Sequence, residues 1–296
     1  GASTGDMLVD NQDTLEAIFR EAPVNIVTHC EDTPTIIENE KAIIAQYGED
    51  IDATFHPRIR DAVSCLKSSQ LAYDLATKHG SNLHILHLTT ADEMKLFTEG
   101  EITDKKITAE VCVHHLFFSE ADYETRGNFI KCNPSVKSEQ DRLALIDAVQ
   151  KNKIDIIATD HAPHTLEEKQ QPYLQAPSGL PLNQHSLLVL LDFYNKGIFT
   201  LEQIVQKTSH NIAERFQIKD RGYIREGSFA DLVIVDLSAN TLVTNENILY
   251  HCGWSPFMDY TFPAAVVHTI INGEIVFEDG VLKEQLPIGS RIEFNR

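Results

Sequence analysis

Residues 153–164 read KIDIIATDHAPH, a short run of β-branched and apolar side chains that ends in an acidic residue followed by two histidines. A run that stays apolar almost to its last residue is typical of a strand buried on both faces of a parallel sheet. Three earlier stretches have the same layout: NIVTHCED (25–32), NLHILHLTT (82–90) and KITAEVCVHH (106–115). A helical pattern follows such strands, and this repeated order predicts parallel βα units.

The segments between these strands carry apolar residues at the 3.6-residue period of a helix packed on one side. Residues 61–79, which follow the His56-Pro57 break, and residues 138–151 are clear examples. Two more helices are predicted over 184–195 and 201–208. Alternating strands and helices of this kind predict the α/β class and favour a closed parallel barrel.

The end of the chain has a different pattern. From about Gly222 short strands alternate with glycine and aspartate turns, as in DLVIVDL, AAVVHTIING and EIVFEDG. The dipeptide Asn272-Gly273 favours a tight antiparallel hairpin. We therefore expect the barrel part to occupy residues 1–221 and a small β domain to occupy residues 222–296.

Composition excludes several classes of protein. The 296 residues are 42% hydrophobic, enough to bury a core, and carry a formal net charge of −19, which argues against binding nucleic acid. The chain has no apolar run of about 20 residues and no signal-peptide layout at its start. Its five cysteines are odd in number and scattered, so we expect reduced thiols. These features predict a soluble cytoplasmic protein that acts on a small molecule and binds no membrane.

Three side chains able to bind metal follow the predicted strands. In a closed parallel barrel the carboxyl ends of the strands share one face, and here those ends carry His29, His87 and Asp160. A single histidine after a strand is usually structural, but two on neighbouring strands indicate a metal site, because zinc needs several converging ligands. Asp160 can bind a metal through one carboxylate oxygen and accept a proton with the other.

Simpler explanations exist for several of these residues. Asp160 could cap a helix, with His161 and His164 exposed in a loop. His84, one pleat before the strand end, is expected to be structural. The pair His114-His115 is expected to lie in the core or behind the site.

Five motifs are the most specific parts of the sequence: THCED (28–32), HLTT (87–90), CNPSVK (132–137), TDHAPHTLEEK (159–169) and APSGL (176–180). Taken together, they resemble those of the dihydroorotases, metal-dependent cyclic amidohydrolases with a TIM-type (β/α)8 barrel. The resemblance runs from GASTGDMLVDN at the start to TIINGEIVFEDG near the end. The pairing of NPSVK with DHAPH distinguishes dihydroorotases from hydantoinases and allantoinases.

The resemblance implies an activity and a set of site residues. The reaction would be the reversible, zinc-dependent hydrolysis of dihydroorotate to N-carbamoyl-aspartate in pyrimidine synthesis. His29 and His87 would bind one zinc of a binuclear pair. Asp160 would bind the other zinc, act as general base and then protonate the departing ring nitrogen. The residues expected to contact the substrate are Asn133, His164, Ser178 and Gly179, the last two through their backbone.

The chain also departs from the family pattern. Members begin with a strand bearing His-x-His and a nearby arginine, and later carry a carboxylated lysine that bridges the metals; these are absent here. GASTG matches the stretch just after that lysine strand, so we expect only the C-terminal part of the barrel, together with part of a small β-sandwich domain. This polypeptide alone is then expected to be inactive. A companion N-terminal fragment and a homodimer are further expectations.

Two other functions remain open. The chain could belong to a dihydropyrimidinase or hydantoinase that acts on neutral cyclic amides, or to a non-catalytic barrel scaffold. The polar segment 165–175 is a candidate lid over the site.

Overall fold

The computed structural model describes residues 9, 11–283 and 289–295. The GASTG stretch, on which part of the resemblance depends, lies outside the described residues. The chain divides into two compact units, one formed by residues 1–183 with 251–256 and the other by residues 184–250 with 257–296.

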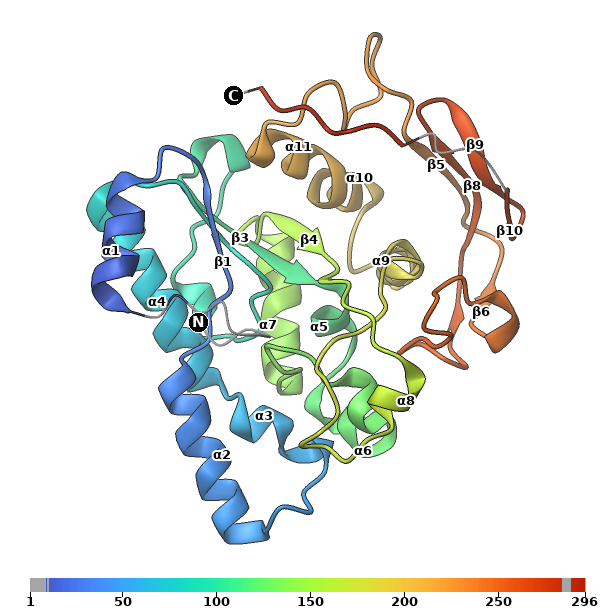
Figure 1. Ribbon diagram of the computed structural model, residues 1–296. Helices are drawn as coiled ribbons and strands as arrows, with labels where there is room; N and C mark the ends of the chain where they lie inside the picture. The colour runs from blue at the N-terminus through green and yellow to red at the C-terminus, as the bar shows by residue number, and fades with distance from the viewer. Residues whose placement is uncertain (1–8, 10, 284–288, 296) are drawn as a thin grey trace. The chain divides into compact units, whose positions relative to one another are not determined.

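The first unit is built on a parallel sheet with the strand order β1-β2-β3-β4. Figure 1 labels three of these strands, β1, β3 and β4. The order in space follows the order along the chain, which is the usual arrangement of consecutive βα units. Each strand corresponds to one of the four predicted runs, so the predicted parallel α/β arrangement is confirmed. The strands are β1 (Ile26–Thr28), β2 (Leu83–Ile85), β3 (Ile107–Cys112) and β4 (Ile156–Ala158).

The strand register brings the carboxyl ends of neighbouring strands side by side. Thr28 pairs with Ile85, and Ile85 in turn pairs with Ala109. Cys112, at the end of β3, pairs with Ala158 at the end of β4. Residues that directly follow β1, β2 and β4 therefore leave the sheet at the same edge.

Helices connect the strands where the apolar period predicts them. The helix predicted over 61–79 is α4 (Ala62–His79); the Asp61 carboxylate accepts from the Ser64 backbone N–H at 2.8 Å, and Gly80 ends the helix with φ 68°. The helix predicted over 138–151 is α7, capped in the same way by Ser138. The other helices of this unit are α1 (Gln12–Glu21), α2 (Thr33–Tyr47), α3 (His56–Ile59), α5 (Val113–Phe117), α6 (Tyr123–Arg126) and α8 (Leu166–Lys169), while α7 spans Glu139–Gln150. Short 3-10 turns cover Ala53–Phe55, Glu93–Lys95, Ile102–Asp104, Glu120–Asp122 and Gly127–Ile130.

The core of the first unit lies on the central strands. Leu83, Ile85 and Val111 are completely buried. Near the start of β4, buried Asp155 pairs with Lys105 at 2.7 Å and accepts from the Ala109 backbone N–H at 3.0 Å. This charged pair fixes β3 and β4 at the end of the sheet opposite the histidines.

The second unit contains helices and an antiparallel sheet with the strand order β10-β9-β8-β5. At the predicted hairpin Asn272 and Gly273 have φ values of 52° and 87°, the left-handed pair that a tight hairpin turn requires. The helices are α9 (Ser186–Asn195), α10 (Leu201–Val205) and α11 (Asn211–Phe216), with a π-helical turn over Gln206–His210 and a 3-10 turn over Asn245–Asn247. The strands are β5 (Leu232–Asp236), β8 (Ala265–Ile271), β9 (Glu274–Glu278) and β10 (Val281–Leu282), and β6 (Thr241–Leu242) pairs with β7 (Thr261–Phe262).

The pair His114-His115 lies in the core, as expected. The two residues are 1% and 3% exposed, and their ring centroids are 3.9 Å apart. Burial lowers the pKa of His114 to about 3, so this imidazole is neutral near pH 7.

None of the helices among the described residues is both long and apolar enough to cross a bilayer.

The buried imidazole of His114 predicts a loss of stability in acid. Its pKa is about 3 in the folded state against an ordinary value of 6.5 in the unfolded state. Between these values the unfolded state binds a proton that the folded state does not, so the free energy of unfolding falls as pH drops below about 6.5, by on the order of 1 kcal/mol per pH unit. His114→Phe should reduce that slope.

The first unit can be followed by the fluorescence of Trp254, the only tryptophan in the chain, which is 4% exposed. Urea titrations between pH 4 and 7 measure the slope. The control is His251→Phe, because His251 is exposed and hydrated in both states. Equal slopes for His114→Phe and wild type would contradict the prediction.

Candidate active site

The histidines after β1 and β2 are in direct contact. His29 Nδ1 lies 3.0 Å from His87 Nε2, and the ring centroids are 4.8 Å apart. Two nitrogens bound to one tetrahedral zinc lie about 3.3 Å apart when each bond is about 2.0 Å. The spacing of these two ring nitrogens thus fits a shared metal ion.

The electrostatic state of His87 also fits a metal ligand. Burial, followed by the nearby His29, lowers its pKa well below the usual value, so the ring is held neutral as metal binding requires. Among the described residues no group hydrogen-bonds His87 Nδ1. Both features suit an imidazole that binds a metal.

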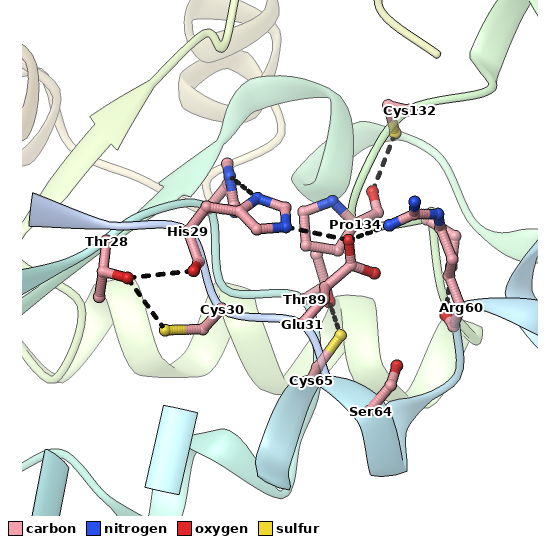
Figure 2. A network of polar contacts seen from close by, with 12 residues as sticks. Thr28, His29, Cys30, Glu31, Arg60, Ser64, Cys65, Thr89, Cys132 and Pro134 are labelled. Carbon is pink, nitrogen blue, oxygen red and sulfur yellow. Dashed lines mark hydrogen bonds and ion pairs between the residues drawn. The ribbon is translucent and has the colours of Figure 1, made fainter. Parts of the chain in front are cut away.

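A buried carboxylate supports His29 from behind (Figure 2). Glu31, which is completely buried, lies 3.2 Å from His29 Nε2 through its Oε2 atom and forms an ion pair with Arg60 through the same oxygen. A carboxylate on the far nitrogen of a ligating histidine orients the ring and makes it a better ligand. Arg60 was not singled out from the sequence, because its partner is 29 residues away.

The neighbours of Glu31 have other roles. Asp32 caps α2 by accepting from the Thr35 backbone N–H at 3.1 Å and pairs with Lys67. Burial raises the pKa of the Cys30 thiol to about 12, so it is an inert core residue.

His84 is completely buried between Thr108 at 2.9 Å and Glu110 at 3.1 Å, which confirms its structural role.

Asp160 follows β4 at the same edge of the sheet. Its φ of 50° and the 35° of His87 lie in the left-handed region; the other described non-glycine residues there are Asn, Asp or Gln. Such strain often accompanies function. Although the residue is exposed, partial desolvation and the nearby Glu110 raise the pKa of Asp160, while His29 lowers it. A raised carboxyl pKa suits a group that takes up and returns a proton.

The predicted substrate-contacting residues form a second group. His164 Nε2 donates to the Ser178 carbonyl at 3.1 Å, and the Gly179 backbone N–H donates to the Lys131 carbonyl at 2.9 Å. Gly179 has φ 142°, and a Cβ there would lie 2.4 Å from the Ala162 carbonyl oxygen, so a side chain is excluded. Asn133 lies two residues after Lys131, and within the described part of the chain no group hydrogen-bonds its buried Oδ1.

The sequence did not reveal two features of the site. The segment 165–175, expected to be a loop, contains helix α8, whose last residue Lys169 is 1% exposed. The buried side chains of Cys112, His114 and His115 place possible metal-binding atoms within 4.8 Å of one another. However, His115 Nε2 lies 3.1 Å from the Pro134 carbonyl oxygen, a bond that accounts for one of its nitrogens.

The chain is similar in sequence to proteins named as dihydroorotases. The chain is 35% identical over 292 residues to the dihydroorotase of Pyrococcus horikoshii, a match that covers 99% of this chain and 62% of that protein. It is 31% identical over 283 residues to the dihydroorotase of Staphylococcus aureus, covering 94% and 63%. The chain thus spans somewhat more than 60% of the length of these relatives.

Solved structures give the same fold. The L-hydantoinase (dihydropyrimidinase) of Arthrobacter aurescens superposes with a TM-score of 0.87 at 25% identity, covering 99% of this chain and 66% of that one. The dihydropyrimidinase of Brevibacillus agri gives 0.84 at 19% identity, covering 95% and 63%. The sequence model of the amidohydrolase family matches residues 8–276. The chain belongs to the amidohydrolase family.

Proposed function

We propose that this chain forms the larger part of a zinc-dependent dihydroorotase, which hydrolyses dihydroorotate reversibly to N-carbamoyl-aspartate in pyrimidine synthesis. The observation that supports this most strongly is the 3.0 Å contact between His29 Nδ1 and His87 Nε2, in a chain 35% identical to a dihydroorotase. Asp160 follows β4, whose carboxyl end lies at the same edge of the sheet as the carboxyl ends of β1 and β2.

In this proposal each member of the first group has a defined role. His29 and His87 hold one zinc, with Glu31 orienting His29. Asp160 contributes to a second zinc and serves as general base. Bound zinc would supply the Lewis acidity that activates water and the ring carbonyl. Asp160 would accept the proton at a carboxylate oxygen and return it to the departing ring nitrogen, a cycle that its raised pKa favours.

The second group would bind and orient the ring. His164 would lie near the substrate carboxylate, and the free amide oxygen of Asn133 would accept from a ring N–H. Ser178 and Gly179 would contact the ring through their backbone, which the lack of room for a side chain at Gly179 supports.

The finer architecture belongs to the same proposal. We infer a (β/α)8 barrel, of which residues 1–221 supply the C-terminal part, and a small β-sandwich domain over residues 222–296. The remaining barrel strands and zinc ligands would come from an N-terminal segment or a companion fragment, so this chain alone would be inactive. Among the described strands of this sheet β1 lies at the edge, a position that supports further pairing. A cytoplasmic homodimer completes the proposal.

One alternative has a specific observation in its favour. The structural similarity to an L-hydantoinase at TM-score 0.87 supports a cyclic amidase that acts on neutral rings. A non-catalytic scaffold is less well supported, because His29, His87 and Asp160 all remain. Substrate choice and zinc dependence separate these three functions.

The proposed function predicts zinc-dependent turnover of an anionic ring. The full-length protein, or this chain with its companion, should hydrolyse dihydroorotate, lose activity after chelation and regain it when zinc is added. Loss of the ring absorbance measures the reaction, and dihydrouracil is the control substrate. Turnover of dihydrouracil alone would favour the hydantoinase alternative, and inactivity toward both rings without bound zinc would favour the scaffold.

Asp160→Asn should remove the general base while keeping the shape of the side chain. We expect kcat to fall on the order of 10²–10⁴-fold in the zinc-loaded protein, with urea stability near that of the wild type. The matched control is Asp147→Asn, which removes an exposed carboxylate paired with Lys151. A near-wild-type kcat for Asp160→Asn would exclude Asp160 as the base.

A further inference from the structure

Two buried lysines hold the segments that carry the proposed substrate contacts. Lys131 and Lys169 are 8% and 1% exposed. An ammonium group is rarely buried this deeply unless its donors are satisfied. Here the hydrogen-bond acceptors are backbone carbonyls of the segment 172–180, which contains Ser178 and Gly179, and of the segment 131–133, which contains Asn133.

The Lys169 ammonium joins the two segments directly. Its Nζ donates to the carbonyls of Pro177 at 2.9 Å and Gly179 at 3.1 Å, and also to the Lys131 carbonyl at 3.3 Å. An ammonium has three donors, and three carbonyl oxygens are present. Burial lowers the pKa of Lys169 to about 7, and the nearby Lys131 acts in the same direction, while Cys132 raises it. Both segments are therefore tied to a single atom.

Lys131 makes the reciprocal connection. It belongs to the segment 131–133, and its Nζ donates across to the carbonyls of Tyr173 and Ala176, both at 2.6 Å. The same Nζ lies 4.3 Å from the centroid of the Tyr173 ring, within cation–π range. The Gly179 backbone N–H returns a hydrogen bond to the Lys131 carbonyl at 2.9 Å.

This arrangement determines how the tripeptide 177–179 is presented. Lys169 binds the first and third carbonyls, and His164 Nε2 binds the second, that of Ser178. Trp254 in turn donates from its Nε1 to the His164 carbonyl at 2.8 Å. A carbonyl bound to an ammonium polarises its peptide, so the Ser178 N–H becomes a stronger donor.

We propose that Lys169 and Lys131 are positioning residues that lock the Ser178-Gly179 backbone and the Asn133 segment into the arrangement that binds the cyclic amide substrate. The identity of the ligand rests on the proposed function. The hydrogen bonds that join the two segments do not depend on it. The two cations also lie beside the loop that would receive an anionic ring, in a chain whose net charge is −19.

The test compares Lys169→Met with Lys105→Met. Methionine keeps much of the side-chain length and removes the donors. Lys105 serves as the control for a general loss of stability, because its side chain is 8% exposed, donates to the Asn152 carbonyl at 2.5 Å and pairs with Asp155, all at the far end of the strands. Hydrogen exchange of the peptide covering residues 172–180, measured by mass spectrometry on the purified protein, reports how rigidly the lysines hold this segment. The measurement does not depend on enzymatic activity.

We expect exchange over 172–180 to become at least tenfold faster in Lys169→Met than in wild type and Lys105→Met. In the zinc-loaded full-length enzyme, KM for dihydroorotate should rise at least tenfold while kcat and zinc content change little. Wild-type exchange in Lys169→Met, or fast exchange with an unchanged KM, would overturn the proposal.

Two further results keep the test decisive. If Lys169→Met does not fold, Lys131→Gln, which retains donors but not the charge, should show a smaller rise in exchange and in KM; wild-type values for it would overturn the proposal. If the wild-type enzyme does not hydrolyse dihydroorotate, the proposed function fails. The exchange measurement still decides whether the lysines hold the two segments in place.

Discussion

The shared edge of a parallel sheet is the constraint on which the site depends. Because the four strands run in the same direction and in chain order, residues that follow them emerge together even when they are far apart in sequence. His29 and His87, separated by 58 positions, come within 3.0 Å in this way, and Asp160 follows the fourth strand. The ion pair between Asp155 and Lys105 holds the strands together at the opposite end of the sheet. One end of the sheet thus holds the strands together, while the other carries the residues proposed to bind metal.

Around that edge the protein supplies neutral imidazoles and buried cations in a strongly acidic chain. Burial keeps His87 and His114 uncharged, which suits metal binding in one case and core packing in the other. Arg60 offsets the buried Glu31 that orients His29. A single physical effect, desolvation, therefore keeps both imidazoles neutral.

The sequence predicted the parts of the fold that follow from local patterns. The four strands, helix α4 and the Asn272-Gly273 turn were found because apolar periodicity and turn chemistry are local. The strand-end rule also identified His29, His87 and Asp160. Arg60 and the two buried lysines, Lys131 and Lys169, could not be found in this way. Their partners lie 8 to 45 positions away, and those of the lysines are backbone carbonyls, which leave no sequence signal. The prediction of a loop over 165–175 missed the one-turn helix α8, although the sequence carries a local signal for it, because Thr165 and Glu168 form a capping box at its start.

The most direct test of the central claim, that His29 and His87 bind one metal, is the zinc content of the purified protein in a double-mutant comparison. His29→Ala and His87→Ala should each lose the same equivalent of zinc, and the double variant should lose no more than either single one. The exposed His251→Ala serves as control. Full zinc in either single variant, or losses that add in the double variant, would contradict a shared metal site and with it the proposed chemistry.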